Sequence, residues 1–193
     1  MRIVAGHYRG TPLKTAPGLS TRPTSDRVRE ALFNILAHGD FAGFSLEGAR
    51  VLDLFAGSGA LGLEALSRGA RYALFVEEAA DARAAIRDNI EAMKLTGQTK
   101  IFRRNATALG PCPTGSGGTF DLLFADPPYN KGLVEPALAS ALDGGWLAPH
   151  AVLVLESSTG DPPALDPRFK AIDTRSYGDT LVTFAGLAHV QEK

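Results

Sequence analysis

The regular alternation of strand-like and helix-like segments after residue 50 constrains the fold of this chain more than any other feature. Short apolar runs, which indicate buried strands, alternate with segments whose apolar residues recur at helical spacing. In chain order these segments cover 51–55, 60–68, 72–76, 80–95, 100–103, 120–125, 132–143 and 151–156. Strands separated by helices form βαβ units, in which a parallel sheet is covered on both faces. The sequence therefore predicts an α/β, Rossmann-like fold.

The end of the chain departs from this alternation. The strand-like segments 169–174 and 180–184 are only a few residues apart, which is too short a gap for a crossover helix. We expect them to pair as an antiparallel hairpin at one edge of a seven-stranded, mostly parallel sheet. Two stretches rich in turn-forming residues, 110–119 and 157–163, are expected to be surface loops.

The first forty residues follow a different pattern. Residues 1–15 alternate loosely around two glycines, which indicates a short β-hairpin. Thr24 or Ser25 can then cap a helix whose apolar residues follow helical spacing and which ends at Gly39. We expect this part of the chain to be an appendage to the α/β fold.

The N-terminal segment is also basic. Six basic residues and two acidic ones give residues 1–36 a net charge of +4, whereas the rest of the chain carries −5. Such an asymmetry is typical of a surface that docks a polyanion, and it fits a solvated face without a partner equally well. We therefore divide the chain into a basic extension over 1–40 and an α/β domain over 41–193.

Length and composition limit the class of protein. The 193 residues are 45% hydrophobic and 21% charged, as in an ordinary globular domain with a short appendage. The chain has no apolar run long enough to span a membrane, and its first residues lack a signal-peptide core. Its one cysteine, Cys112, cannot form an internal disulfide, and no Cys/His cluster has metal-ligand spacing. We expect a cytoplasmic protein with no membrane association and no metal site.

A glycine-rich turn follows the first strand of the α/β domain. Residues 57–62 read Gly-Ser-Gly-Ala-Leu-Gly, and Glu77 stands twenty residues after the first of these glycines. The glycines let a ligand approach the backbone, and an acidic side chain at this distance accepts hydrogen bonds from ribose hydroxyls. Asp53, inside the strand, can order the turn or receive an ammonium group. A nucleoside-containing cofactor is expected, and the ammonium group favours S-adenosylmethionine over NAD without excluding NAD.

The tetrapeptide Asp126-Pro127-Pro128-Tyr129 ends the fourth strand, beside the expected cofactor crevice. An exocyclic amine of a nucleobase is a poor nucleophile because its lone pair is delocalised into the ring. Asp126 and the carbonyl of Pro127 can accept hydrogen bonds from such an amine, and Tyr129 offers a flat face on which the base stacks. The motif therefore predicts methylation of a base amine without a metal, with Asp126, Pro127 and Tyr129 as the catalytic residues.

Three motifs together resemble the RsmD family of bacterial rRNA guanine-N2 methyltransferases, and the resemblance covers almost the whole chain. The motifs are the run 22–34, the cofactor loop within 53–65, and the tetrapeptide 126–129. The first is the most specific, because the other two recur across amino-methyltransferases. The resemblance implies methyl transfer from S-adenosylmethionine to N2 of one guanine in 16S rRNA. It places that rRNA in an assembled or partly assembled small ribosomal subunit and implies no obligate protein partner.

The resemblance also implies roles for individual residues. Glu77 would hold the ribose of the cofactor, and the pair Asn105-Ala106 would flank its adenine. The residues expected to bind the cofactor are Asp53, Phe55, Gly57, Ser58, Gly59, Glu77, Asn105 and Ala106. The residues expected to contact RNA, mainly at its phosphates, are Arg9, Lys14, Arg22, Thr24, Arg27 and Arg29.

Four alternatives remain open from the sequence. The tetrapeptide serves adenine as well as guanine, so an adenine-N6 methyltransferase acting on DNA or RNA is the main alternative. A protein-amide methyltransferase is less favoured, because that chemistry usually pairs with Asn where Asp126 stands. The glycine turn by itself would also allow an NAD-binding oxidoreductase. A non-catalytic RNA-binding assembly factor could retain the same fold.

Overall fold

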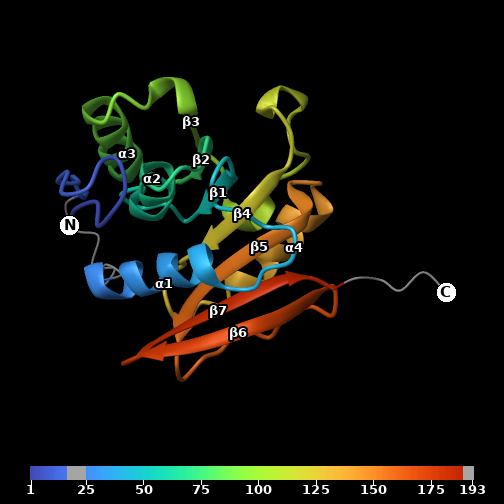
Figure 1. The fold of residues 1–193 in the computed structure, drawn as a ribbon. Helices are drawn as coiled ribbons and strands as arrows, with labels where there is room; N and C mark the ends of the chain where they lie inside the picture. Colours follow the sequence, from blue (N-terminus) through green and yellow to red (C-terminus); the bar gives the residue numbers. More distant parts are fainter. Residues whose placement is uncertain (17–24, 189–193) are drawn as a thin grey trace.

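A seven-stranded sheet runs through the computed structural model, which describes residues 1–16 and 25–188 (Figure 1). Its strand order is β3-β2-β1-β4-β5-β7-β6, with β1 and β4 at the centre. The strands are β1 (Arg50–Leu54), β2 (Tyr72–Val76), β3 (Thr99–Phe102), β4 (Phe120–Ala125), β5 (Leu147–Ser158), β6 (Phe169–Tyr177) and β7 (Thr180–Leu187). The helices are α1 (Asp26–His38), α2 (Ala60–Ser67), α3 (Ala80–Ala92) and α4 (Val134–Asp143). The predicted α/β class with a mostly parallel sheet is confirmed.

The helices cover both faces of the sheet and create a separate apolar core on each. Helices α1, α2 and α3 pack on one face, and α4 packs on the other (Figure 1). Every residue of β1 is buried, as expected for a central parallel strand covered on both sides. Among the described residues, no helix combines the length and apolarity that a bilayer-spanning segment requires.

Close packing of α2 on the sheet depends on Gly62. A Cβ atom at this position would lie 2.4 Å from the ring of Phe75 on β2 and 3.1 Å from the carboxylate of Asp53 on β1. Only a residue without a side chain lets the helix approach the strands this closely. The last glycine of the predicted loop therefore brings the start of α2 against the two strands that carry the expected cofactor residues.

The boundaries of the inner strands follow the sequence pattern closely. The predicted strands 72–76 and 120–125 coincide with β2 and β4. Helix α1 begins after Ser25, whose side chain accepts a hydrogen bond from the Val28 N–H, and it ends at Gly39. Differences appear at other element ends. Helix α3 stops at Ala92 rather than 95, and α4 begins at Val134 rather than 132.

The C-terminal half of the sheet is larger than predicted. Strand β5 begins at Leu147 and extends to Ser158, whereas the sequence predicts only 151–156. The expected antiparallel hairpin of β6 and β7 is present at the sheet edge. Its second strand, β7, lies between β5 and β6 and pairs with β5 from Val152 to Ser158. Pairing with β7 extends β5 past residue 156 at its C-terminal end, and at its N-terminal end Leu147 pairs with Phe120 of β4.

The segment 110–119, expected to be a surface loop, is held to the sheet by Arg50. It contains a short 3₁₀ turn over Thr114–Ser116. The guanidinium of Arg50 donates hydrogen bonds to the carbonyls of Ser116 and Thr119, the latter at 3.1 Å. The same guanidinium lies over the Tyr72 ring, 4.5 Å from its centroid.

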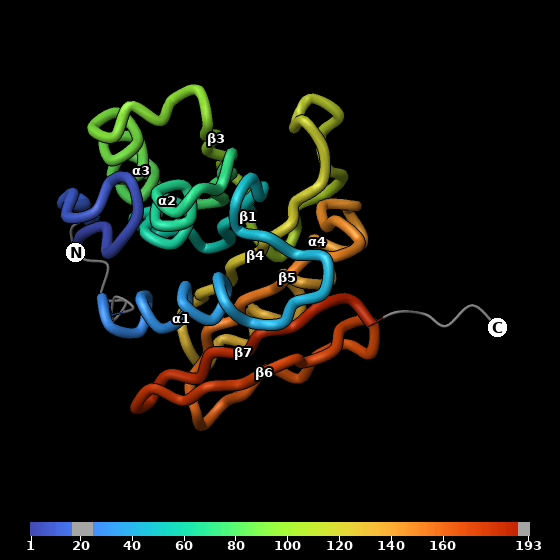
Figure 2. Tube along the Cα trace, viewed as in Figure 1, coloured from blue at the N-terminus to red at the C-terminus, as the bar shows by residue number. Residues whose placement is uncertain are grey.

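The first sixteen residues fold back on themselves as a short, irregular hairpin without regular strands. A single antiparallel bridge joins Arg2 to Pro12, and the turn between them lies against α2 and α3 (Figure 2). Gly6 approaches α2 so closely that a Cβ atom would lie 1.9 Å from the carbonyl oxygen of Ser67. Backbone hydrogen bonds from Ile3 to Thr11, from Gly10 to Ile3 and from Leu13 to Met1 join the two halves, and polar contacts with the two helices hold them against the domain. We refer to residues 1–16 as the N-terminal arm.

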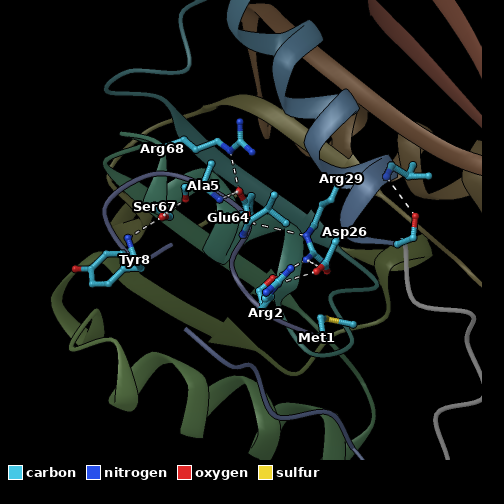
Figure 3. A network of polar contacts seen from close by, with 12 residues as sticks. Met1, Arg2, Ala5, Tyr8, Asp26, Arg29, Glu64, Ser67 and Arg68 are labelled. Carbon is cyan, nitrogen blue, oxygen red and sulfur yellow. Dashed lines mark hydrogen bonds and ion pairs between the residues drawn. The ribbon is translucent and has the colours of Figure 1, made fainter. Parts of the chain in front are cut away.

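The buried carboxylate of Glu64 on α2 holds this arm in place (Figure 3). Glu64 is 0% exposed and accepts hydrogen bonds from the backbone N–H groups of Val4 at 2.7 Å and Ala5 at 3.0 Å. Arg68 donates to the same carboxylate at 2.8 Å, and the Nε atom of Arg29 lies 3.9 Å from it. One anion therefore joins the arm, α1 and α2.

We predict that Glu64→Gln lowers the free energy of unfolding by about 3–5 kcal/mol, because it removes the charge that compensates the buried Arg29 and the partly buried Arg68. Urea denaturation followed by circular dichroism measures this change. The matched control is Glu91→Gln, a change of the same kind at an exposed position of α3. A loss no larger than that of the control would contradict the central role of this carboxylate.

Candidate cofactor and amine site

The main candidate site is a cavity of about 310 Å³ at the carboxyl ends of the central parallel strands. This volume lies at the lower end of the range of small-molecule sites. The residues that line it are Met1, Thr15, Arg29, Asp53, Phe55, Ala56, Gly57, Ser58, Ala60, Leu61, Val76, Glu77, Glu78, Arg104, Ala106, Asp126 and Pro128. The structure thus brings most of the expected cofactor residues and part of the tetrapeptide to one cavity.

The turn between β1 and α2 shapes the floor of this cavity through unusual backbone angles. Phe55 has a φ of +57°, a left-handed conformation that is rare for an aromatic residue. Gly57 and Gly59 follow with φ values of +56° and +79°. Gly59 is the N-cap of α2 and does not itself line the cavity. These angles turn the chain sharply between the strand and the helix and leave the backbone of the loop open to a ligand.

Asp53 lies beneath this turn and is 2% exposed. Its Oδ2 atom accepts a hydrogen bond from the N–H of Gly62 in the first turn of α2, at 3.0 Å. Burial raises the pKa of Asp53 to about 8, with a further increase from the nearby charge of Glu77, while the Gly62 hydrogen bond opposes the shift. Asp53 therefore orders the turn, and a cation in the cavity would favour its ionised form.

Glu77 follows β2 and faces the same turn. Its Oε2 atom accepts a hydrogen bond from the N–H of Gly57 at 2.9 Å, and its Oε1 atom accepts one from the N–H of Ala79 at 2.8 Å. Each carboxylate oxygen has a second lone pair, so both can still accept hydrogen bonds from ligand hydroxyls. The side chain that the sequence assigns to the ribose is thus fixed at the cavity wall.

The charge of this wall fits S-adenosylmethionine better than a dinucleotide. Three carboxylates, those of Asp53, Glu77 and Glu78, line the cavity around the glycine turn. A dinucleotide places its pyrophosphate at this helix N-terminus, where backbone N–H groups bind the anion. Here Asp53 already accepts a hydrogen bond from Gly62 in the first turn of that helix, and Glu77 accepts one from Gly57 in the loop before it. The carboxylate acceptors of this wall therefore suit a ligand with hydroxyl groups and a positive charge.

The two residues expected to flank the adenine differ in position. Ala106 is buried and lines the cavity. Asn105 is exposed and does not line it, because its Oδ1 atom accepts hydrogen bonds from the backbone and hydroxyl of Thr107 and so caps a 3₁₀ turn. Arg104, which the sequence analysis did not select, lines this end of the cavity.

The tetrapeptide forms the opposite wall. Asp126 and Pro128 line the cavity, whereas Pro127 is buried and borders a smaller hollow of about 40 Å³ on the other side of the motif. Tyr129 also borders that hollow. The carboxylate of Asp126 therefore shares one cavity with Asp53 and Glu77, as the positions of their strands in the sheet require.

The ring of Tyr129 is held in place through its hydroxyl group. The hydroxyl donates a hydrogen bond to Glu156 at the end of β5, at 2.8 Å, and lies 3.0 Å from the hydroxyl oxygen of Thr180 on β7. Burial is the main cause of the raised pKa of Tyr129, so the phenol keeps its proton at neutral pH. Two neighbouring strands thus fix the ring that was expected to stack on a base.

The residues expected to contact RNA separate into three groups. Arg9 and Arg27 are exposed and border one hollow between the arm and α1. Lys14 is exposed and forms an ion pair with Asp88 on α3, at 2.9 Å. Arg22 and Thr24 lie outside the described residues.

Arg29 corrects the sequence analysis. It is only 1% exposed, and its Nη2 atom donates hydrogen bonds to the carbonyl of Arg2 at 2.6 Å and to Asp26 at 2.8 Å (Figure 3). Such burial is incompatible with the expected role of Arg29 as a surface contact for RNA. The cause is its position on the apolar face of α1, one turn before the buried Phe33.

The N-terminal arm contributes to the cofactor cavity, which the sequence analysis did not anticipate. Met1 and Thr15 line the cavity, and the hydroxyl of Ser58 contacts the sulfur of Met1 at 3.4 Å. The buried amide of Asn89 on α3 bonds to both backbone groups of Lys14 and also donates to the carbonyl of Ser58 at 3.0 Å. Asn89 thus links the arm directly to the glycine turn.

Comparisons with known proteins agree with this geometry. The family described as conserved hypothetical protein 95 matches residues 1–186. The chain is 40% identical over 159 residues to the ribosomal RNA small subunit methyltransferase D of Escherichia coli, a match that covers 81% of this chain and 74% of the relative. It is 37% identical over 143 residues to the putative rRNA methyltransferase YlbH of Bacillus subtilis, covering 74% of each. The solved structure of the putative methyltransferase yhhF from Escherichia coli matches with a TM-score of 0.80, 33% identity and 97% coverage of both chains.

We predict that Asp53→Asn changes how stability depends on pH. The folded state keeps the proton of Asp53 up to about pH 8, whereas the unfolded chain releases it near pH 4. The contribution of Asp53 to the free energy of unfolding therefore falls as the pH rises from about 4 to about 8. The stability of Asp53→Asn relative to the wild type should increase across this window and level off above it.

Urea denaturation at a series of pH values measures this difference. Asp88→Asn, on the exposed face of α3, is the matched control, and we expect no trend of this kind for it. A difference between Asp53→Asn and the wild type that stays constant from pH 4 to pH 8 would refute the raised pKa.

Proposed function

The chain belongs to the conserved hypothetical protein 95 family, which is the RsmD family, and we propose that it methylates N2 of a guanine in small-subunit rRNA. It has the class I methyltransferase fold, whose methyl donor is S-adenosylmethionine. The names of its relatives support rRNA as the substrate class. We further propose an assembled or partly assembled small subunit as the form in which this rRNA is bound, and the cytoplasm as the place of action.

The observation that carries the proposal is the shared cavity of the two halves of the site. The carboxylates of Asp53 and Glu77 occupy one part of the wall, and Asp126 occupies another. A nucleoside-binding region and a group that accepts hydrogen bonds from an amine therefore meet in one volume of about 310 Å³. Proximity of this kind is the main requirement for a group transfer between two bound molecules.

S-adenosylmethionine supplies an electrophilic methyl group on its positively charged sulfur. Asp53 receives the ammonium group of this cofactor, and Glu77 accepts hydrogen bonds from its ribose. Asp126 accepts a hydrogen bond from the exocyclic amine, and the carbonyl of Pro127 accepts a second. These two acceptors draw the amine nitrogen towards tetrahedral geometry and free its lone pair, which would form the bond to the methyl group as the bond from sulfur to that methyl group breaks. S-adenosylhomocysteine would leave, and the methylated nitrogen would lose one proton, which Asp126 can pass to solvent. Their contribution is electrostatic and positional, as is usual for preorganised polar groups in enzymes.

Tyr129 positions the base in this proposal. Its hydroxyl is held by Glu156 and Thr180, so little rotational freedom remains for the ring to lose when a base stacks on it. Stacking of a base on an aromatic ring contributes about 1–3 kcal/mol. The fixed ring can therefore hold an extruded guanine beside Asp126.

Arg9 and Arg27 form the proposed contact with the rRNA backbone. Both are exposed and border the same hollow, which the arm and α1 enclose. Contacts with phosphates orient a nucleic acid without reading its sequence. This surface would therefore position the small subunit, while the tetrapeptide acts on the base.

An experiment that identifies the modified nucleoside tests this function. Small subunits from a strain without the enzyme are incubated with the protein and labelled S-adenosylmethionine, and the rRNA is digested and separated by chromatography. We expect N2-methylguanosine. Labelled N6-methyladenosine would instead support the alternative, an adenine-N6 methyltransferase.

We predict that Asp126→Ala lowers turnover at least about a hundredfold, because removal of one preorganised polar group from an active site has an effect of this size. The affinity for the cofactor product S-adenosylhomocysteine, measured by calorimetry, should change little, since the carboxylate acts on the amine. The matched control is Asp121→Ala, at the start of the same strand and away from the cavity. Normal turnover in Asp126→Ala would refute the mechanism.

We also predict that Arg9→Ala combined with Arg27→Ala lowers the slope of log affinity against log salt by about one to two units, since each phosphate contact releases about one counterion. Filter binding of small subunits at several salt concentrations measures the slope. The matched control, Arg168→Ala with Arg175→Ala, changes the net charge equally at two exposed arginines near β6. An equal change in both double variants would mean that charge alone, and not this surface, is responsible.

A further inference from the structure

We propose that Arg29 binds the carboxylate of the methionine part of the cofactor, opposite Asp53, which binds its ammonium group. This inference rests on the proposed methyltransferase function. It gives a role to the buried arginine of α1, which the sequence analysis had assigned to RNA. The argument has three steps: where Arg29 lies, how much positive charge surrounds it, and why the other cavity arginine is less suitable.

The position of Arg29 places it near the part of the cavity that Asp53 and Asp126 share. Arg29 stands one helical turn before Phe33, whose ring packs against Phe124 of β4 with 5.7 Å between centroids. Asp126 follows β4 directly, and β4 is the neighbour of β1, which carries Asp53. Arg29 lines the same cavity as these two carboxylates although it is 1% exposed to solvent.

The polar cluster around Arg29 carries an excess of positive charge. Its members are Arg2, Asp26, Arg29, Glu64 and Arg68, three cations and two anions (Figure 3). Each anion is shared between two arginines. Asp26 pairs with Arg2 at 3.1 Å and Arg29 at 2.8 Å, while Glu64 pairs with Arg68 at 2.8 Å and lies 3.9 Å from Arg29. The cluster therefore has a net charge of +1 beside the cavity.

Most of the charge that the other described residues bring to the cavity is negative. Glu77, Glu78 and Asp126 supply three carboxylates, and Asp53 becomes a fourth when a bound cation favours its ionised form. A free carboxylate bound against such a wall would be repelled unless a cation lay close to it. An amino-acid group carries an ammonium and a carboxylate on one carbon atom, so it needs an anion and a cation at neighbouring positions. Asp53 and Arg29 provide this pair.

Among the described residues that line the cavity, Arg104 is the second arginine, and it lies at the adenine end. It follows β3, which is separated from β1 by β2. Its guanidinium donates to the carbonyl of Leu109 and lies over the Phe102 ring, 5.2 Å from the centroid. This is the end where Ala106 is placed beside the adenine. Arg29 enters the same cavity from α1, which packs on the sheet beside β4.

Two ligands that differ only by the carboxylate test the inference. S-adenosylhomocysteine contains both the ammonium and the carboxylate, and S-adenosyl-3-thiopropylamine contains the amine alone. Calorimetry of the full chain measures both affinities without any turnover. We expect Arg29→Met to weaken binding of S-adenosylhomocysteine by about tenfold to a hundredfold, the range of a charge-assisted hydrogen bond, and binding of the amine by less than about threefold.

Arg68→Met is the matched control, because it removes a guanidinium from the same Glu64 carboxylate but does not line the cavity. Both ligands should bind to it with nearly wild-type affinity. Arg29→Lys keeps the charge of the cluster and secures the comparison if Arg29→Met fails to fold. In Arg29→Lys the preference for S-adenosylhomocysteine over the amine should be smaller than in the wild type, since a lysine cannot form the paired contacts of a guanidinium.

The outcomes separate this inference from the function on which it rests. If the Arg29 variants bind both ligands more weakly by the same factor, or keep the wild-type ratio of the two affinities, the proposed role of Arg29 is overturned. The proposed methyltransferase function is unaffected by either result. Failure of the wild-type protein to bind either ligand would count against the methyltransferase function itself. Similar loss of discrimination in Arg68→Met would show that the charge of the cluster, rather than contact with Arg29, is responsible.

Discussion

The buried carboxylate of Glu64 is the interaction on which the remaining site depends. An ion in an apolar interior is stable only when its charge and lone pairs are matched, and here two arginines and two backbone N–H groups supply the match. Because these partners come from the arm, from α1 and from α2, one side chain determines how three segments meet. Met1 of the arm and Arg29 of α1, which belong to two of these segments, also line the cavity.

A second constraint acts in the first turn of α2, the helix that carries Glu64. The first turn of α2 offers free N–H groups that attract an anion. In this chain Asp53 meets that demand from inside the protein, through its hydrogen bond with Gly62. The ligand therefore meets a carboxylate instead of a set of backbone N–H groups. A carboxylate binds a cationic cofactor, whereas free N–H groups bind a pyrophosphate. Similar glycine turns can therefore serve different cofactors.

Local patterns in the sequence predict the central elements well. The strands 72–76 and 120–125 and the start of α1 follow from apolar spacing and a serine cap, which are properties of a few adjacent residues. The length of β5 could not be predicted in this way, because its two ends pair with residues distant in the sequence, Leu147 with Phe120 of β4 and Ser158 with Thr180 of β7. Most of the expected cofactor residues line the cavity, since the ends of parallel strands meet at one edge.

The roles of the arm and of Arg29 were beyond such reasoning. A basic residue in a basic segment reads as a surface residue, and only the fold shows that Glu64, thirty-five positions later, draws Arg29 inward. One signal was available in the sequence. Arg29 lies four residues before Phe33 and three before Leu32, on the apolar face of its helix, where a solvent-exposed cation is not expected.

The amide of Asn89 bonds to both the arm and the glycine turn, and this link has a consequence for binding. Because one amide bonds to both segments, ordering of one segment also contributes to ordering of the other. If the cofactor and rRNA affect each other's affinity through this link, thermodynamic reciprocity requires the two effects to be equal in size.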